Sequence, residues 1–301
     1  MKRSNNFVLY LKGGLGNQLF QYATAYSYAK EHNKTLVINI DQYYGQRWNQ
    51  EAGFILNKVV KNLLICPASK WTSLIGGSTI FHYTGRFVRK FFWKKGKVFE
   101  ETEGFVYSKK LIKSNNFDGL YGYFQSPLYF KQNFNRLLEN INLTVVSVKG
   151  LEFEYMIRNA HTSVAIHYRD YGDIATGGED IKKYMGDINI EYYLKAIELF
   201  KTTYTDIQFY VFSNNIKSAR MKFKEVSNLI FMDYKSKFPW EDMALMSICN
   251  HNVICNSSYS WWSAYLNKNK DKIVVAPKTY GNLLKSTELE YSLFPNSWVQ
   301  L

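Results

Sequence analysis

The stretch FVLYLKGGLGNQLFQYA, residues 7–23, decides the fold, because it runs from a strand-like apolar segment through a glycine-dense turn into a helix-like segment. Apolar residues at helical spacing continue towards His32. The segment Thr35–Ile40 then has the pattern of a buried strand and ends at Asp41. The sequence therefore begins with a strand, a helix and a second strand, as in parallel α/β proteins.

The glycine-dense turn is a candidate ligand site. Glycines permit positive φ angles and carry no Cβ, and the first turn of the next helix offers unpaired N–H groups with partial positive charge. An anionic group such as a phosphate fits there. The candidate substrate-binding residues of this turn are Gly14, Gly16, Asn17 and Gln18.

Two other interpretations of the turn stay open. Gly14, Gly16 and the later Asp41 partly match the fingerprint of an NAD-dependent oxidoreductase, although Leu19 stands where a third glycine is usual. The glycines can also serve only to close a tight strand-to-helix connection. No Gly-Lys-Ser/Thr follows, which excludes a Walker loop.

Length and composition indicate a globular protein of two lobes. A chain of 301 residues exceeds the usual size of one domain, so we expect lobes at residues 1–150 and 151–301, with their boundary near residues 145–160. A hydrophobic content of 46% excludes a disordered chain. No apolar run is long enough to span a bilayer, and the 3 cysteines suit a reducing compartment, so we expect a cytoplasmic protein.

The formal net charge of +13 favours an acidic partner such as a nucleic acid, an anionic membrane or a phosphorylated substrate. The basic, aromatic segment Arg86–Lys97 suits peripheral contact with the anionic inner face of the cell membrane. The alternative is a solvated element whose aromatic rings pack inward. A nucleic-acid-binding protein stays an alternative, but no RRM, KH or helix-turn-helix pattern occurs, and we expect no nucleic-acid partner.

The second half of the chain alternates predicted strands with predicted helices. The strands are expected at residues 163–169, 207–212, 229–232, 252–256 and 272–276, and the helices at 190–204, 216–226, 240–249 and 257–267. Such alternation predicts a parallel sheet covered by helices, whose ligands bind beyond the carboxyl ends of the strands.

Arg169 ends the first of these strands, so its guanidinium is expected to project into a cleft and to bind a diphosphate. The alternative is an ion pair with Asp170 or Asp173 that holds the loop. His167 lies two residues earlier on the same face of the strand and either positions Arg169 or a phosphate, or is structural. The candidate catalytic residues are therefore Arg169, His167, Asp170 and Asp173.

The segment NSSYSWW, residues 256–262, places an amide and several hydroxyls at a strand-to-helix junction. It predicts a second phosphate site made of Asn256, Ser257, Ser258 and Ser260. The alternative is simple capping of the helix by a serine, with the tryptophans in the core.

Two further clusters are weaker candidates. Ser213 and Asn214 follow another predicted strand, where they either bind a nucleotide base or ribose or form an ordinary turn. Cys249, His251 and Cys255 have too few ligands for a zinc site.

These motifs together resemble the bacterial α-1,2-fucosyltransferases of glycosyltransferase family 11. The residues that carry the resemblance are GGLGNQLFQYA at residues 13–23, His167-Tyr168-Arg169, FSNN at 212–215, the segment 246–266 around NSSYSWW, and the region of Pro277. Their order and spacing match over nearly the whole chain.

The resemblance implies a GT-B-like α/β fold, in which two Rossmann-type lobes with parallel sheets face a cleft. It implies that the amino-terminal lobe lies on the acceptor side and that the carboxyl-terminal lobe binds GDP-fucose. The reaction would be an inverting transfer of L-fucose to the 2-hydroxyl of galactose, in a galactose-terminated or lipid-linked surface glycan of the O-antigen or capsule type. No cofactor or metal would be required, GDP-fucose being the donor substrate.

Two motifs depart from the family pattern. Asp170 stands where the family usually has a second arginine, and Asn214-Asn215 replaces the common Asp-Asp. The cations and N–H groups of the site would stabilise the departing GDP without a divalent ion. The acceptor's proton would go to Asp170, Asp173 or His167, among which the sequence does not choose.

Overall fold

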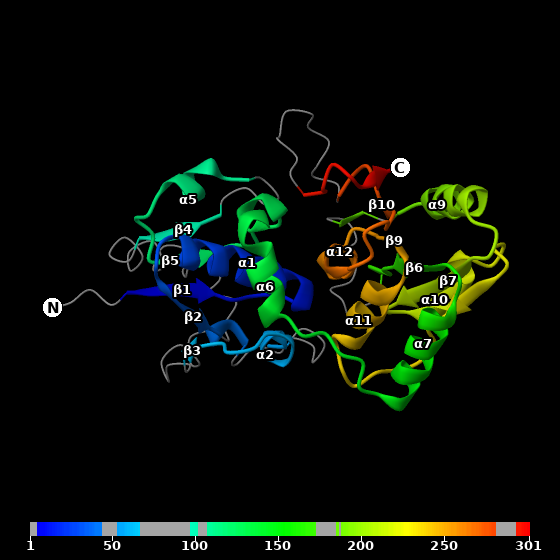
Figure 1. Cartoon of the computed structure of the whole chain (residues 1–301), viewed down its shortest axis with the longest axis horizontal. Helices are drawn as coiled ribbons and strands as arrows, with labels where there is room; N and C mark the ends of the chain where they lie inside the picture. Colours follow the sequence, from blue (N-terminus) through cyan, green and yellow to red (C-terminus); the bar gives the residue numbers. More distant parts are fainter. Residues whose placement is uncertain are drawn as a thin grey trace. The chain divides into compact units, whose positions relative to one another are not determined.

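The computed structural model describes residues 5–43, 53–66, 97–101, 107–172, 185–186, 188–280 and 293–301. The chain divides into two compact units, one formed by Met1–Asn142 with Leu289–Leu293 and the other by Leu143–Glu288 with Phe294–Leu301 (Figure 1). The boundary expected at residue 150 falls inside a helix of the second unit. No helix of the described residues is long and apolar enough to cross a membrane.

The described part of the first unit forms a five-stranded parallel sheet in the order β3-β2-β1-β5-β4. Its strands are β1 (Asn6–Tyr10), β2 (Thr35–Asn39), β3 (Ile65–Cys66), β4 (Val98–Glu100) and β5 (Gly119–Tyr121). Its α-helices are α1 (Leu15–Glu31), α2 (Leu56–Val59), α5 (Lys109–Lys113) and α6 (Phe134–Asn140), and its 3-10 helices are η1 (Asp41–Tyr43), η3 (Pro127–Tyr129) and η4 (Lys131–Asn133). The strand, helix and strand predicted from residues 7–41 are thus confirmed.

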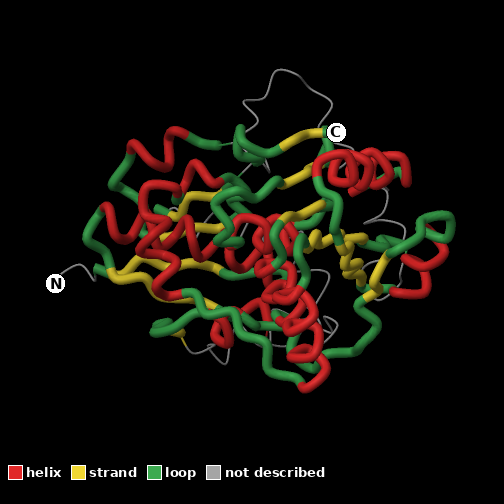
Figure 2. The backbone as a smooth tube through the Cα atoms, turned by 45° about the vertical axis from the view of Figure 1, so that its right-hand side comes forward, coloured by secondary structure: helices red, strands yellow, loops and turns green. Residues whose placement is uncertain are grey.

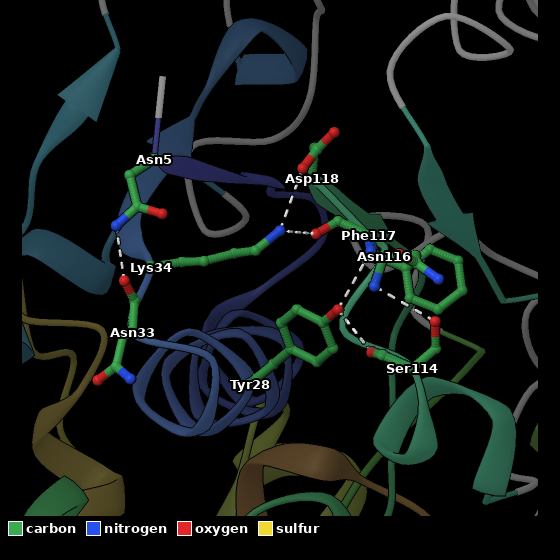
Figure 3. A network of polar contacts seen from close by, with 8 residues as sticks. All are labelled: Asn5, Tyr28, Asn33, Lys34, Ser114, Asn116, Phe117 and Asp118. Carbon is green, nitrogen blue, oxygen red and sulfur yellow. Dashed lines mark hydrogen bonds and ion pairs between the residues drawn. The ribbon is translucent and has the colours of Figure 1, made fainter. Parts of the chain in front are cut away.

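A polar network ties the loop between α1 and β2 to the segment that enters β5 (Figure 3). The Lys34 ammonium donates to the backbone oxygen of Phe117 and lies 3.1 Å from the Asp118 carboxylate. The Tyr28 hydroxyl donates to the backbone oxygen of Ser114 at 2.7 Å and accepts from the N–H of Phe117 at 3.2 Å. These bonds hold the segment that enters β5 against α1 and the residues that follow it.

The described part of the second unit forms a six-stranded parallel sheet in the order β11-β10-β9-β6-β7-β8 (Figure 2, strands in yellow). Its strands are β6 (Ser163–Tyr168), β7 (Gln208–Ser213), β8 (Leu229–Phe231), β9 (His251–Val253), β10 (Val274–Ala276) and β11 (Val299–Gln300). Its helices are α7 (Val148–Asn159), α9 (Ile190–Thr203), α10 (Ile216–Lys222), α11 (Glu241–Ile248) and α12 (Ser258–Leu266).

Every residue of β6 is buried because helices cover both faces of this sheet. Val164, Ile166 and Tyr168 pack against α9 and α10. Ala165, on the opposite face, packs with residues of α7 and α11. His167 shares the face of Ala165, since successive side chains of a strand point to opposite faces.

Candidate active site

The strand order of the second sheet reverses between β6 and β9. From β6 the chain adds β7 and β8 on one side, and it then returns to add β9, β10 and β11 on the other. In open α/β sheets, ligands bind beyond the carboxyl ends of the strands at such a switch point. Arg169 directly follows β6, and Asn256 and Ser257 follow the end of β9, so the structure brings these predicted residues to the same switch point.

Arg169 is half-buried, and no carboxylate of the described residues forms an ion pair with it. Its positive charge contributes to lowering the pKa of His167, because it disfavours a second positive charge nearby. The ion pair with Asp170 that sequence analysis left open is absent from the described part of the chain. This guanidinium is able to donate a bidentate pair of hydrogen bonds to a phosphate group.

His167 is buried and neutral. Burial, with a smaller contribution from Arg169, lowers its pKa to about 3. Its Nδ1 lies 3.1 Å from the sulfur of Cys255, whose own pKa burial raises to about 12. A protonated thiol donates to Nδ1, which leaves the ring proton on Nε2. His167 is therefore a neutral imidazole of low basicity, and its pKa of about 3 makes it a poor candidate for the general base.

Asp170 is held in place by the two asparagines that follow β7. The Asn214 side chain accepts from the Asp170 N–H at 2.9 Å and donates to its backbone oxygen at 3.0 Å. The Asp170 carboxylate accepts from the Asn215 side chain at 3.1 Å and from the Gly172 N–H at 2.9 Å. The two departures from the family motifs therefore touch each other, and both hold the segment that carries Arg169.

The remaining residues of these two loops serve the turn itself. Ser213 and Asn215 exchange hydrogen bonds, the Ser213 hydroxyl donating to the Asn215 backbone oxygen at 3.1 Å and accepting from its N–H at 3.0 Å. Asn215 also caps α10 by accepting from the N–H of Ser218 at 3.1 Å. Asp173 lies outside the described residues.

Asn256, Ser257, Ser258 and Ser260 lie on the β9 side of the switch point, where α12 begins. Ser257 caps α12, its hydroxyl accepting from the N–H of Tyr259 at 3.3 Å, and Ser258 opens the helix half-buried. Ser260 is buried and donates to the backbone oxygen of Ser257 at 3.3 Å, so it stabilises the turn from inside. The N-cap alternative is thus confirmed for Ser257, and Ser258 is the serine nearest the open end of the helix.

A pocket of about 200 Å³ lies beside Asn256. Asn256 is 4% exposed, and its Oδ1 has no hydrogen-bond partner in the described part of the chain. Its Nδ2 donates to the backbone oxygen of Met185, and the backbone oxygen of Asn256 accepts from the Tyr171 hydroxyl. A buried amide oxygen without a partner is costly, and a ligand N–H would satisfy it.

Sequence analysis missed three other residues of this site. Asn189 caps α9, and Lys278 follows β10, and both line the pocket. Tyr171 joins the loop after β6 to the end of β9 through its bond to Asn256. The positions of Lys278 and Tyr171 just after strands were the available signal, because polar residues at the carboxyl ends of parallel strands reach the ligand side of the sheet.

The glycine turn of the first unit is built from within. Gly13 has a φ of +76°, and a Cβ there would lie 3.0 Å from the Asn17 side chain. Gln18 is fully buried and donates to the backbone oxygens of Gly13 and Gly53, both at 2.8 Å. Its Oε1 accepts from the N–H groups of Ile55 and Leu56. Gln18 thus uses its whole hydrogen-bonding capacity within the protein, which identifies it as an anchor of the turn.

The other candidate residues of this turn are Gly14, Gly16 and Asn17. A Cβ added to Gly14 would meet no atom within 4 Å, so the space beside this residue is open. Gly16 is buried in the first turn of α1, and the Asn17 side chain accepts from Gln125 at 2.5 Å. The amino end of α1 has no side-chain cap, which leaves its first N–H groups available to a ligand.

Other candidate clusters have separate roles. The Cys249 sulfur contacts the backbone oxygen of Leu245, and the His251 Nδ1 accepts from the N–H of Ile273, so neither shares a ligand position with Cys255. Asp41 exchanges hydrogen bonds with the Asn39 side chain. Of the basic segment Arg86–Lys97, only Lys97 belongs to the described residues.

Comparison with known proteins decides the family. The family model of glycosyl transferase family 11 matches residues 7–301. The chain belongs to this family.

Two proteins from Escherichia coli are similar to this chain over nearly its whole length. The O-antigen biosynthesis glycosyltransferase WbnK is 28% identical over 97% of this chain and 99% of its own length. An alpha-1,2-colitosyltransferase is 29% identical over 97% of each chain. The protein is therefore a glycosyltransferase, with a nucleotide-sugar donor and a glycan acceptor, and the oxidoreductase and nucleic-acid alternatives are not retained.

The fold is shared with a more distant glycosyltransferase. The ADP-heptose LPS heptosyltransferase II of E. coli matches 98% of this chain and 90% of its own chain with a TM-score of 0.51, at 11% identity. The expected GT-B-like class of two parallel α/β units is thus confirmed.

Proposed function

We propose that this family 11 enzyme transfers L-fucose from GDP-fucose to the 2-hydroxyl of a galactose in a surface glycan of the O-antigen type, with inversion at the anomeric carbon. The observation that carries the donor assignment is Arg169, a guanidinium at the β6–β9 switch point without a carboxylate partner among the described residues. The role of the second unit as the donor-binding lobe is part of this proposal.

The donor's diphosphate would lie between Arg169 and the amino end of α12. Fucosyl transfer requires GDP to depart with growing negative charge, and a fixed guanidinium together with helix N–H groups stabilises that charge more in the transition state than in the ground state. Ser258, the first residue of α12, would bind a phosphate oxygen through its hydroxyl. This arrangement supports catalysis without a divalent cation, which we include in the proposal.

The pocket beside Asn256 suits the guanosine. The Asn256 Oδ1 is an acceptor, so it would bind a base that presents ring and exocyclic N–H donors, as guanine does. Asn189 and Lys278 supply further polar groups on the same pocket. Asn214 would act through Asp170 rather than by touching the nucleotide, because its hydrogen bonds go to the Asp170 backbone.

Colitose is a second candidate for the transferred sugar. It differs from fucose only by lacking the 3-hydroxyl, and the alpha-1,2-colitosyltransferase that resembles this chain carries it in its name. The two relatives from E. coli also support an O-antigen acceptor. We propose that the enzyme works in the cytoplasm with peripheral contact to the anionic inner membrane, supported by the net charge of +13.

The test is incubation of the protein with GDP-fucose or GDP-colitose and a panel of galactosides, followed by linkage analysis of the product. We expect an α-1,2-linked deoxyhexose on galactose and turnover that persists in excess EDTA. A different linkage, or no transfer from either GDP-sugar while another nucleotide sugar is consumed, would contradict the proposal.

A further inference from the structure

A pocket of about 240 Å³ lies in the first unit, between the second half of α1, the start of β2, residues 61–64 and Asn140 at the end of α6. It follows from the register of the sheet. β2 begins at Thr35, but Ile38 is its first residue that pairs with β3. The start of β2 therefore extends beyond β3, and the described residues leave a hollow there. No residue of the glycine turn lines it, so this pocket is separate from the candidate ligand site of that turn.

The wall of the pocket carries no negative charge. None of the described residues that line it is acidic. The backbone oxygen of Leu64 accepts from the N–H of Ile38 at 2.7 Å. The backbone oxygen of Asn140 accepts from the N–H of Lys61 at 2.9 Å. These bonds fix Lys61 and Leu64 at the pocket and occupy two of the acceptors in its wall.

Cations line the pocket instead. Lys30 and Lys61 are exposed, and neither forms an ion pair with a described carboxylate. The Lys30 ammonium lies 5.6 Å from the centre of the Tyr26 ring, which also lines the pocket. Lys34 is a third lining lysine, but its ammonium is paired with Asp118 (Figure 3). Of the described lysines at the pocket, Lys30 and Lys61 therefore remain for a negatively charged ligand.

A tyrosine hydroxyl adds a hydrogen-bond donor. Tyr22 lines the pocket and is 3% exposed, and its hydroxyl forms no hydrogen bond within the described residues. Burial, with a smaller contribution from Tyr26, raises the pKa of Tyr22, so this hydroxyl stays protonated and is able to donate. A buried polar group without a partner is costly, and an anionic oxygen in the pocket would satisfy it. Ammonium groups and a phenol without a carboxylate form a lining that suits a phosphate.

The surface next to the pocket is apolar. Leu64 is 55% exposed and Ile65 is 38% exposed, and they are two of the three large apolar side chains exposed in the described part of the first unit. Leu36 and Leu63, which line the pocket, are half-buried. A soluble phosphate would use the lysines and leave these side chains in water. A phospholipid has both a phosphate and acyl chains, and exposed apolar residues beside lysines are typical of surfaces that bind a membrane.

We propose that this pocket binds the phosphate of an anionic phospholipid and thereby attaches the first unit to the membrane surface. This inference rests on the peripheral membrane contact of the proposed function and identifies where that contact occurs. Lys30, Lys61 and the Tyr22 hydroxyl bind the phosphate oxygens, while Leu64 and Ile65 enter the boundary between headgroups and acyl chains. The net charge of +13 favours the approach to an anionic bilayer.

The test is sedimentation of the whole protein with vesicles of phosphatidylglycerol and phosphatidylcholine at about 0.1 M salt. The variant Lys30→Gln/Lys61→Gln removes the two cations of the pocket. Each lysine near an anionic surface contributes about fivefold to the binding constant, so we expect binding about 20-fold weaker than that of wild type. The matched control is Lys110→Gln/Lys113→Gln on α5, which removes the same charge from exposed lysines that do not line the pocket. Its binding should stay within about twofold of wild type.

Two single variants separate a lipid from a soluble phosphate. Tyr22→Phe removes only the hydroxyl and should weaken vesicle binding about fivefold. Leu64→Ser should weaken vesicle binding at low and high salt alike, because the contact that it removes is apolar. If Leu64→Ser binds vesicles as wild type does while inorganic phosphate competes with them, the pocket is a site for a soluble phosphate and the proposal is wrong.

Comparison of the two lysine pairs is equally decisive. Equal losses in the pocket pair and in the α5 pair would show attraction by net charge alone, and the proposal would be wrong. If wild type does not sediment with the vesicles, the membrane contact itself is absent and the inference fails with it.

A kinetic measurement separates this inference from the transfer reaction. Lys30→Gln/Lys61→Gln should keep the wild-type melting temperature and the wild-type kcat/KM for transfer to a soluble galactoside, because neither lysine belongs to the candidate active site. A loss of that transfer would make the pocket part of the substrate site and overturn the proposal. If wild type transfers no sugar but binds vesicles through the pocket, the proposed transfer fails and this inference stands.

Discussion

The two switch points of this enzyme differ in the charge that they present. Between β6 and β9 the available group is a cation, Arg169, and the nearby carboxylate of Asp170 is bound by Asn215 and Gly172. At the switch point of the first sheet, between β1 and β5, the cation Lys12 lies 4.2 Å from the centres of two tyrosine rings, while the carboxylate, Glu101, is bound by the N–H groups of Tyr123 and Phe124. The two switch points therefore differ in the charge that is available at the carboxyl ends of their strands.

The two sites also differ in how they are built. Side chains fix the loops of the second unit, where Ser257, Asn215 and Asn189 cap helices. In the first unit α1 starts without a side-chain cap, the Gln18 side chain holds the glycine turn, and Phe124 adopts a left-handed conformation. Substitutions of side chains should therefore affect donor binding most directly in the second unit, whereas the first unit should respond mainly to changes that alter its turns.

The largest effect is expected from Arg169→Ala, which removes a cation that forms no ion pair with the described carboxylates. We expect kcat/KM to fall about 10³-fold, equivalent to about 4 kcal/mol of transition-state stabilisation, because leaving-group charge is no longer balanced. The melting temperature should stay near that of wild type, since the half-buried side chain fills no core volume. Steady-state kinetics with both substrates and thermal denaturation measure the two quantities.

Two variants sharpen the Arg169 experiment. Arg169→Lys keeps the charge but loses the planar pair of donors, so it should recover only part of the activity. Arg220→Ala removes an exposed arginine that pairs with Asp233 on the surface, and its kinetics should match wild type. If a folded Arg169→Ala protein kept near-normal turnover, Arg169 would not stabilise the leaving group, and the difference in charge between the two switch points would have no role in catalysis.

Gln18→Ala should have the next largest effect, on stability. The change removes the acceptor of the buried N–H groups of Ile55 and Leu56 and a donor to the backbone oxygens of Gly13 and Gly53. We expect the free energy of unfolding to fall by about 3 kcal/mol, measured by urea denaturation. Gln132→Ala, at an exposed position of η4, is the control. If the unfolding midpoint were unchanged and substrate binding were weaker, Gln18 would instead be a residue that binds the substrate.

Most of the fold follows from the sequence, because buried parallel strands alternate with amphipathic helices. The strands β6 to β10 and the helices between them lie where alternation predicts them. Helix α7 was not predicted, because its exposed residues Val148, Leu151 and Tyr155 are also apolar. They obscure the helical spacing of the buried residues Phe153 and Ile157 in the sequence. The strands β3, β4 and β11 are too short for a period to be visible.

The candidate site was predictable where one residue is decisive and not where its partners are distant. Arg169 could be placed because it ends an apolar strand. The anchoring role of Gln18 depends on Gly53, Ile55 and Leu56, and no local pattern of the sequence links these residues. The same holds for Asp170, whose partners follow a different strand.

A pH effect of intermediate size is expected from His167. Its pKa is about 3 in the folded protein, below the ordinary value of about 6.5, so acid favours the unfolded chain, which binds the proton more readily. The stability is fully present above pH 6.5 and is lost as the pH falls from there towards 3. Between pH 6.5 and pH 5 the loss should amount to about 2 kcal/mol.

The measurement compares urea denaturation of wild type and His167→Asn across this range, since asparagine keeps a polar atom near the position of Nδ1. The difference between the two curves isolates His167 from the other titrating groups. His161→Gln, at an exposed position, should retain the full acid dependence of wild type. Parallel curves for wild type and His167→Asn would show that His167 is not buried as a neutral ring.

The smallest effect concerns the pair formed by Asp170 and Asn215, which joins the two departures from the family motifs. The Asn215 amide donates to the Asp170 carboxylate at 3.1 Å. Asn215→Asp alone sets two carboxylates against each other, and Asp170→Arg alone leaves the Asn215 amide facing guanidinium donors. The double variant restores an arginine and an aspartate of the usual family pattern as an ion pair. We therefore expect a coupling free energy of about 1 kcal/mol in donor kcat/KM, with both single variants weaker than the double. Additive losses would mean that the two positions changed independently and that Asp170 does not hold Arg169 in place through Asn215.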